Sequence, residues 1–386
     1  MMLNLDKSTW QRVKFGEVIQ SVTDRVDDPS EAGVERYVGL EHLVPGVLTV
    51  QRWDDPSKVS AQKLLFKPGD VIFGRRRAYQ KKVARADFEG ICSAHALVLR
   101  AIPGKVDPDF LPVFLSSDYF LDRAVGISVG SLSPTVNWRD LKVQEFDLPP
   151  LDQQKRIADL LWALEDHAAS LRTVMEANGS ASSDFFGVSL QESTNRVSIV
   201  DRIQSATVGV VVRPTQYYTE EPGGVPALRG LNVGAGSFDL SDLVYFDQAS
   251  AASLRKSTLQ EGDVVVVRTG RPGDAAVVPN HIAGSNCIDL IIVRPGERLN
   301  PHFLCRFINS QECKNEIAKL SAGTAQQHFN VGALKLLSVP DSDLDAQDEL
   351  IQKMESFDEV NAIASDEVVA VDTLRTSLLS SIFGES

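Results

Sequence analysis

The sequence has few of the residues that build metal centres, disulfide frameworks or membrane spans. Its 386 residues include four cysteines and six histidines. Cys92, Cys287, Cys305 and Cys313 form no C-x-x-C pair, so zinc and a redox couple are not expected, and scattered cysteines fit a reducing compartment. No apolar run approaches the roughly 20 residues of a membrane helix. The N-terminal segment lacks the apolar core of a secretory signal, so we expect a cytoplasmic protein that makes no membrane contact.

Motifs for catalysis are also missing. There is no G-x-x-x-x-G-K-[ST] loop, no G-x-G-x-x-G fingerprint and no H-E-x-x-H helix. The N-P-P-[YF] or D-P-P-[YF] run that amino-methyltransferases use is absent as well. His95, in the strand-like stretch SAHALVLRA, is interpreted as a satisfied core histidine. We therefore expect no catalytic residue and no bound metal in this chain.

Acidic residues dominate, but they are unevenly distributed. The formal net charge is −13. Residues 1–150 hold 20 basic and 20 acidic residues, whereas residues 341–386 hold 2 basic and 12 acidic residues. Within the neutral first part, residues 75–82 contain five basic side chains in the stretch RRRAYQKK. Because salt screens charges beyond about 8 Å, such a local cluster can bind phosphates even in an acidic protein.

The chain repeats itself at an offset of about 193 residues. FKPGDVIFGRRR at 66–77 matches LQEGDVVVVRTG at 259–270, and VGSLSPTVNWRDL at 129–141 matches AGTAQQHFNVGAL at 322–334. Each copy contains short β-rich runs bounded by glycine, proline and aspartate, followed by a long helical stretch. The predicted fold class is α+β, with two repeated β-rich domains joined by two long antiparallel coiled-coil helices. The predicted segments are domain 1 at 1–150, helix 1 at 151–179, domain 2 at 190–341 and helix 2 at 345–384.

The two long helices are predicted from their apolar spacing. In the second, Leu350, Phe357, Ala364, Val371 and Leu378 recur every seven residues, which favours a coiled-coil partner. The first is predicted to end at the glycine and serine run that begins with residue 179. Since no other helix of this length is predicted, each would pair with the other. The alternative is that both are ordinary amphipathic helices packed on their own domains.

Two pairs of loops carry the candidate DNA contacts. Arginine and lysine clamp phosphates and recognise guanine, while amide and hydroxyl tips can contact base edges. The candidates in the first copy are Arg75, Arg76, Arg77, Tyr79, Lys81, Lys82, Ser131, Ser133 and Thr135. Those in the second copy are Arg268, Thr269, Arg271, Thr324, Gln326, Gln327 and His328. A solvated turn after a strand is the simpler interpretation of either loop, but recurrence with altered residues favours two different recognition surfaces.

Several motifs, in the same order in both halves, resemble the specificity subunits of type I restriction–modification systems. LPPLDQQKRIADLL at 148–161 is similar to that family's L-P-P-L-x-E-Q-x-x-I-A-x-x-L run. KPGDVIFGRRRAYQKKV is similar to its G-D-[VI]-L-x-S-R strand and loop, and DTLRTSLLSSIFG at 372–384 to its C-terminal motif. The sequence departs from the pattern where the second copy lacks the Pro-Pro pair.

The resemblance implies a non-catalytic subunit that recognises double-stranded DNA in bacteria or archaea. Each domain would recognise one half of a bipartite site, and the helices would set the gap between the halves. Two modification subunits, which carry S-adenosylmethionine, would bind the chain. Restriction subunits, which use ATP and Mg²⁺, would join them. Two other functions remain open from the residues alone: a standalone enzyme acting on DNA, and a two-domain adaptor between proteins.

Overall fold

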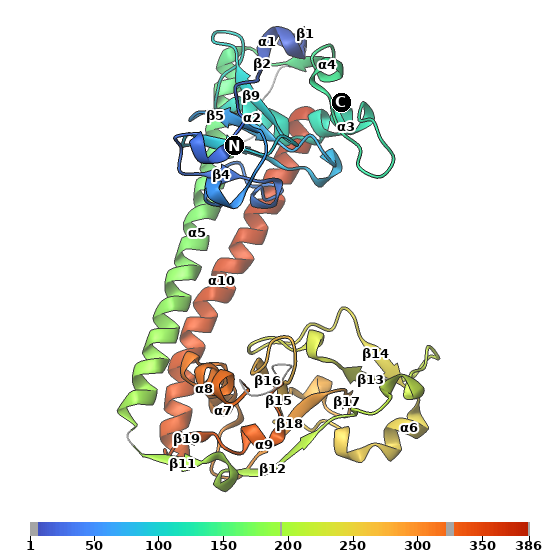
Figure 1. Cartoon of the computed structure of the whole chain (residues 1–386), viewed down its shortest axis with the longest axis vertical. Coiled ribbons are helices and arrows are strands. Elements are labelled where there is room, and N and C mark those ends of the chain that lie inside the picture. Colours follow the sequence, from blue (N-terminus) through green and yellow to red (C-terminus); the bar gives the residue numbers. More distant parts are fainter. Residues whose placement is uncertain (1–6, 194, 322–327, 385–386) are drawn as a thin grey trace. The chain divides into compact units, whose positions relative to one another are not determined.

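The chain folds into two compact units that contain the same kinds of elements. The computed structural model describes residues 7–193, 195–321 and 328–384. Unit 1 comprises residues 1–174 and 364–386, and unit 2 comprises residues 175–363. Each unit has a β-rich part, a few short helices, and one half of each of two long helices, α5 (Leu151–Glu192) and α10 (Leu344–Phe383) (Figure 1).

Unit 1 contains two four-stranded sheets. The first has the strand order β2 (Ile19–Val22), β9 (Leu97–Ala101), β6 (Val71–Phe73), β7 (Val83–Arg85). The second has the order β3 (Arg25–Val26), β5 (Lys63–Phe66), β8 (Gly90–Cys92), β4 (Tyr37–Val38), and its β4–β8 pair is parallel. Val71 and Phe73 lie in the core that contains the helices, whereas Ile72 lies in the core between the sheets. Because side chains alternate along a strand and both faces of β6 meet a core, β6 is apolar throughout.

An aromatic cluster holds the helices of unit 1 against the first sheet. These helices are α1 (Phe15–Val18), α2 (Phe110–Ser116), α3 (Asp118–Gly126) and α4 (Trp138–Leu141), and β1 (Gln11–Lys14) pairs with β10 (Glu145–Leu148) beside them. The ring of Phe114 lies 5.5 Å from that of Phe120 and 5.3 Å from that of Phe146. Phe383, in the last turn of α10, lies 5.9 Å from Phe114. The end of α10 is therefore part of the unit 1 core.

Unit 2 repeats this arrangement. Its main sheet has the order β12 (Ile203–Val208), β18 (Leu290–Pro295), β15 (Val264–Val267), β16 (Ala275–Val277). The second sheet has the order β14 (Val244–Phe246), β13 (Val225–Leu228), β17 (Asn286–Cys287), and β11 (Arg196–Ser198) pairs with β19 (Ser338–Pro340). Its short helices are α6 (Gln248–Ser253), α7 (Pro301–Asn309), α8 (Gln311–Ser321) and α9 (Val331–Leu334).

The same buried ion pair fixes the main sheet in both units. Asp70, 1% exposed, accepts hydrogen bonds from Nε and Nη2 of Arg100 at 2.5 and 2.7 Å. Asp263, also 1% exposed, accepts the same two bonds from Arg294 at 2.8 and 2.9 Å. Asp70 and Asp263 are 193 positions apart, so the repeat predicted from the sequence is a repeat of structure.

Both long helices begin with a buried, anchored glutamine. Oε1 of Gln154 accepts from the backbone N–H of Asp107 at 2.9 Å, and Oε1 of Gln347 accepts from that of Asn300 at 2.9 Å. In each case Nε2 donates to the carbonyl five residues earlier, at 2.8 and 2.9 Å. The second helix therefore starts in the same way as the first although it lacks the Pro-Pro pair.

The predicted end of the first long helix, at residue 179, is wrong. α5 continues through the glycine and serine run to Glu192. Phe186 and Leu190, 5% and 1% exposed, lie four residues apart on one face and are buried in the core of unit 2. Tertiary packing of this face outweighs the poor helix propensity of glycine and serine, as it commonly does.

Within each unit the two long helices run antiparallel. In unit 1, Nε2 of His167 lies 2.8 Å from Oε1 of Glu367. In unit 2, Nδ2 of Asn178 donates to Oδ1 of Asn361 at 3.0 Å, and α5 and α10 run in opposite chain directions through these contacts. Ala364 and Val371, two members of the predicted heptad, are buried. The predicted α+β class with paired long helices is confirmed.

Candidate nucleic-acid interface

The basic stretch after β6 forms a tight, exposed loop. A single 3₁₀ turn, Ala78–Gln80, is flanked by Arg77 and Lys81, whose backbones are left-handed, with φ of 56° and 52°. Ala78 is buried and anchors the turn, while Arg76, Arg77 and Tyr79 are exposed. The turn therefore exposes Arg76, Arg77 and the ring of Tyr79 to solvent.

The second candidate loop of the first copy lies directly against this turn. The backbone N–H of Arg77 donates to the carbonyl of Pro134 at 2.7 Å, and the N–H of Val136 donates to the carbonyl of Arg75 at 2.9 Å. Nη2 of Arg76 lies 3.5 Å from Oγ of Ser133. The structure thus brings together Arg75, Arg76 and Arg77 with the loop that carries Ser131, Ser133 and Thr135. These residues form one surface, which we call the unit 1 loop platform.

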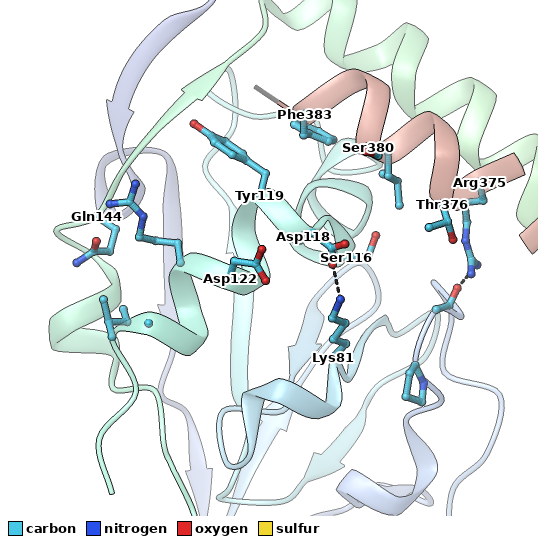
Figure 2. A pocket seen from close by; sticks show the side chains of 17 residues that line it. Lys81, Ser116, Asp118, Tyr119, Asp122, Gln144, Arg375, Thr376, Ser380 and Phe383 are labelled. Carbon is cyan, nitrogen blue, oxygen red and sulfur yellow. Dashed lines mark hydrogen bonds and ion pairs between the residues drawn. The ribbon is translucent and has the colours of Figure 1, made fainter. Parts of the chain in front are cut away.

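Two predicted DNA contacts point elsewhere. Nζ of Lys82 donates to the carbonyl of Leu40 at 2.6 Å and is partly buried. Nζ of Lys81 lies 2.5 Å from Oδ1 of Asp118 at the start of α3, a pair drawn in Figure 2. Both ammonium groups therefore already have partners within the protein, and neither lies in the loop platform.

Lys81 lies at a cavity of about 940 Å³ in unit 1. Its walls are α3 and the last turns of α10, and Figure 2 shows Asp118, Asp122 and Tyr119 on one side with Arg375 on the other. Unit 2 has a cavity of about 1220 Å³ between α8 and the end of α5. Lys81 and Arg375, the two cations named here, are both engaged by acceptors within the protein.

In the second copy the loop arginine is buried and bound by neighbouring side chains. Arg268 is 9% exposed, its Nη1 pairs with Asp289, and its Nη2 contacts Nε2 of His328. The N–H of Phe329 donates to the carbonyl of Arg268 at 3.0 Å, which repeats the bond between Val136 and Arg75. Nδ1 of His328 lies 2.8 Å from Oγ1 of Thr269. Arg268, Thr269 and His328 therefore form one cluster, the unit 2 loop platform.

Of the remaining candidates in the second copy, only Arg271 is described. It is exposed, its Nη2 donates to the carbonyl of Val233 at 2.9 Å, and its Nη1 lies 3.5 Å from Asp274. Thr324, Gln326 and Gln327 lie outside the described residues, so their part in the platform stays a prediction.

His95 was misassigned by sequence reasoning, and Asp289 was missed. His95 is exposed rather than in the core, and its Nε2 lies 3.3 Å from Nη1 of Arg76. Partial burial, together with Arg76 and Arg75, lowers the pKa of His95. The signal that could have found both residues is the repeat, because Asp289 lies one residue and His95 two residues before the strand that pairs with the loop-bearing strand.

The four cysteines are free and buried, and burial raises the pKa of each thiol, that of Cys305 to about 11. Within residues 7–193, 195–321 and 328–384, no three His, Cys, Asp or Glu side chains are grouped closely enough to hold a metal ion. In the same ranges no helix has the length and apolar character needed to span a bilayer.

Part of the chain matches a known family model, and several known proteins are similar to the chain. Residues 7–174 match the model of the type I restriction modification DNA specificity domain. The chain is 20% identical to the type I restriction enzyme MjaVIII specificity subunit of Methanocaldococcus jannaschii, over 96% of this chain and 91% of that protein. The chain is thus similar to the type I specificity subunits over most of its length. The EcoDI specificity subunit of Escherichia coli is 26% identical over 39% of this chain, a match that spans 33% of that relative.

Solved structures support the same fold. One solved structure concerns the complex assembly and conformational transition of the type I restriction–modification system. Its matching chain has a TM-score of 0.61 and 20% identity, and the match covers 97% of this chain and 97% of that one. The specificity subunit of such a system from M. genitalium has a TM-score of 0.55 at 14% identity, over 100% of this chain and 98% of that one. At these identities the likeness concerns the fold, which agrees with the sheets and long helices described above.

Proposed function

We propose that this chain is the DNA specificity subunit of a type I restriction–modification system, and that each of its units recognises one half of a bipartite, asymmetric DNA site. The observation that carries the proposal is the repeated loop platform, built on the same backbone bond in both units but with different side chains. Arg75, Arg76 and Arg77 dominate the first platform, while Arg268, Thr269 and His328 make up the second. Identical scaffolds with different contact groups suit two different half-sites.

The long helices would set the gap between the half-sites. α5 has 42 residues and α10 has 40, which corresponds to roughly 60 Å each at about 1.5 Å per residue. Half-sites on one face of a duplex lie about 34–36 Å apart or multiples of that distance. Helices of this length are sufficient to place two domains on successive turns of DNA.

The chemistry would come from other subunits. We propose that two modification subunits bind this chain and supply S-adenosylmethionine-dependent adenine methylation, and that restriction subunits supply ATP- and Mg²⁺-dependent cleavage. Three observations support a non-catalytic role for this chain: its thiols are buried and have raised pKa values, Lys81 in the unit 1 cavity is engaged, and residues 7–174 match the DNA specificity domain.

Methylation mapping tests the proposal. DNA is incubated with the modification subunits and S-adenosylmethionine, with and without this chain, and the methylated adenines are mapped. We expect a two-part asymmetric motif that depends on the chain. Turnover of DNA by the chain alone with Mg²⁺ would instead favour a standalone enzyme, and the absence of salt-dependent DNA binding would favour an adaptor between proteins.

A further inference from the structure

One position of the repeat differs in charge between the two loop platforms. β6 pairs Phe73 with Leu97 of β9, and β15 pairs Val266 with Ile291 of β18. Two residues beyond Phe73 and Val266 come the loop arginines, and two residues before Leu97 and Ile291 come His95 and Asp289. In unit 2 the side chains of Arg268 and Asp289 pair, whereas in unit 1 His95 contacts Arg76, the residue next to Arg75. An imidazole in unit 1 therefore occupies the position of a carboxylate in unit 2.

In unit 2 the carboxylate begins a relay of fixed hydrogen bonds. Asp289 holds Nη1 of Arg268, and Nη2 of Arg268 contacts Nε2 of His328. A guanidinium can only donate, so Nε2 of His328 accepts and its Nδ1 carries the proton. Nδ1 then donates to Oγ1 of Thr269 at 2.8 Å. With its oxygen accepting from Nδ1, the Thr269 hydroxyl has no acceptor among the described residues for its own hydrogen, and the Thr269 side chain is exposed.

In unit 1 the equivalent arginine has no such partner. Nε of Arg75 is buried and, among the described residues, has no hydrogen-bond acceptor. His95 offers Nε2 to the neighbouring Arg76 at 3.3 Å, and with its lowered pKa the ring is neutral at pH 7. Among the described residues neither Arg75 nor Arg76 is paired with a carboxylate, so these two charges of the unit 1 loop platform are not neutralised.

We propose that the residue at position 95 or 289 decides the role of the loop arginine. His95 leaves Arg75 and Arg76 as cations that contact DNA phosphates or guanine. Asp289 makes Arg268 a positioning residue, which orients His328 and presents the Thr269 hydroxyl as a hydrogen-bond donor to one base pair. The inference rests on the proposed function and specifies how each platform would carry it out.

The test exchanges the two residues in the full chain bound to its modification subunits. His95→Asp should place a carboxylate beside the unit 1 arginines. The magnitude of the slope of log K against log salt should then fall by about one, and binding to all DNA sequences should weaken. Asp289→Asn should leave the first half-site unaffected but reduce discrimination at one base pair of the second about tenfold. Thr269→Val should remove the same discrimination while the ion pair of Arg268 stays intact. This second variant tests the inference even if Asp289→Asn impairs folding.

Matched controls separate these effects from net charge. His281→Asp and Glu261→Gln make the same charge changes near the opposite end of the unit 2 sheet, where β15 begins and β16 ends. Both controls should retain the wild-type salt slope and base preference. If the wild-type complex methylates a two-part motif while His95→Asp, Asp289→Asn and Thr269→Val behave like the controls, the inference is overturned and the proposed function stands. If no motif depends on the chain, the proposed function itself fails.

Discussion

Arg375 of α10 pairs with Glu165 of α5 inside unit 1, with Nη1 and Oε2 3.3 Å apart. Glu165 is 2% exposed and Arg375 is 9% exposed. The other carboxylate oxygen of Glu165 accepts from the N–H of Leu48 at 3.2 Å, and Nη1 of Arg375 donates to the carbonyl of Gly46. One ion pair therefore attaches a loop of the β-rich part to both long helices of its unit.

Removing the cation of this pair should destabilise unit 1 strongly. Arg375→Ala leaves a buried carboxylate without its partner, a change that costs about 3–5 kcal/mol in comparable buried pairs. Glu165→Gln should cost less, since Arg375 keeps the Gly46 carbonyl and Asp372. Urea unfolding of the full chain measures both free energies. Lys155→Ala, which removes an exposed pair on α5, is the control and should change stability by at most about 1 kcal/mol. Equal decreases in the free energy of unfolding for all three variants would contradict this account.

The same carboxyl should make stability depend on pH. Burial raises the pKa of Glu165 above its ordinary value of 4.5, against the opposing effect of Arg375. The folded state therefore binds more protons than the unfolded state at this site, and the stabilisation falls as pH rises from 4.5 through the raised pKa. The difference in unfolding free energy, wild type minus Glu165→Gln, should decrease across that window. An increase would mean that the folded-state pKa is lowered instead.

The C-terminal part of α5 should be essential to unit 2. Leu190, 1% exposed, is packed in the core of that unit, so Leu190→Ala should cost about 2–5 kcal/mol. Val188, two residues earlier on the same helix, is 54% exposed, and Val188→Ala should change stability by less than about 0.5 kcal/mol. Thermal or urea unfolding checks both. Matching small effects would indicate that the helix ends near residue 179 after all.

The basic residues of the first loop should divide into two groups. Arg77 is exposed in the loop platform, so Arg77→Ala should weaken binding to all DNA sequences and lower the salt slope by about one. Lys82 donates to the carbonyl of Leu40, so Lys82→Ala should leave the slope nearly unchanged. Sequence alone predicts equal contributions from both. Binding isotherms at several salt concentrations distinguish the two expectations, and equal slopes for the two variants would favour the sequence-based one.

Most of the architecture could be predicted because the repeat preserves residues with fixed structural roles. Asp70 and Asp263 each neutralise a sheet arginine, so both copies retain the Gly-Asp pair. The end of α5 could not be predicted, because local propensity favours a stop at the glycine and serine run. The apolar face that continues the helix is completed only by the core of unit 2, which is formed by residues far along the chain.

The candidate site was predicted less completely, for a related reason. Residue type alone makes Arg77 and Lys82 equivalent cations, and only the fold shows that one ammonium is bound to a backbone carbonyl. Arg268 looks like a free DNA contact until Asp289 is placed beside it by the pairing of β15 with β18. Gln327 stays a predicted base contact, because it lies outside the described residues.

The most direct test of the central claim is a map of methylated adenines in DNA exposed to the modification subunits with this chain. The account predicts one asymmetric motif of two short parts separated by a fixed gap, present only when the chain is present. It further predicts that substitutions in the unit 1 loop platform alter one part and substitutions in the unit 2 platform alter the other. Methylation that is independent of the chain, or a single undivided motif, would contradict the account.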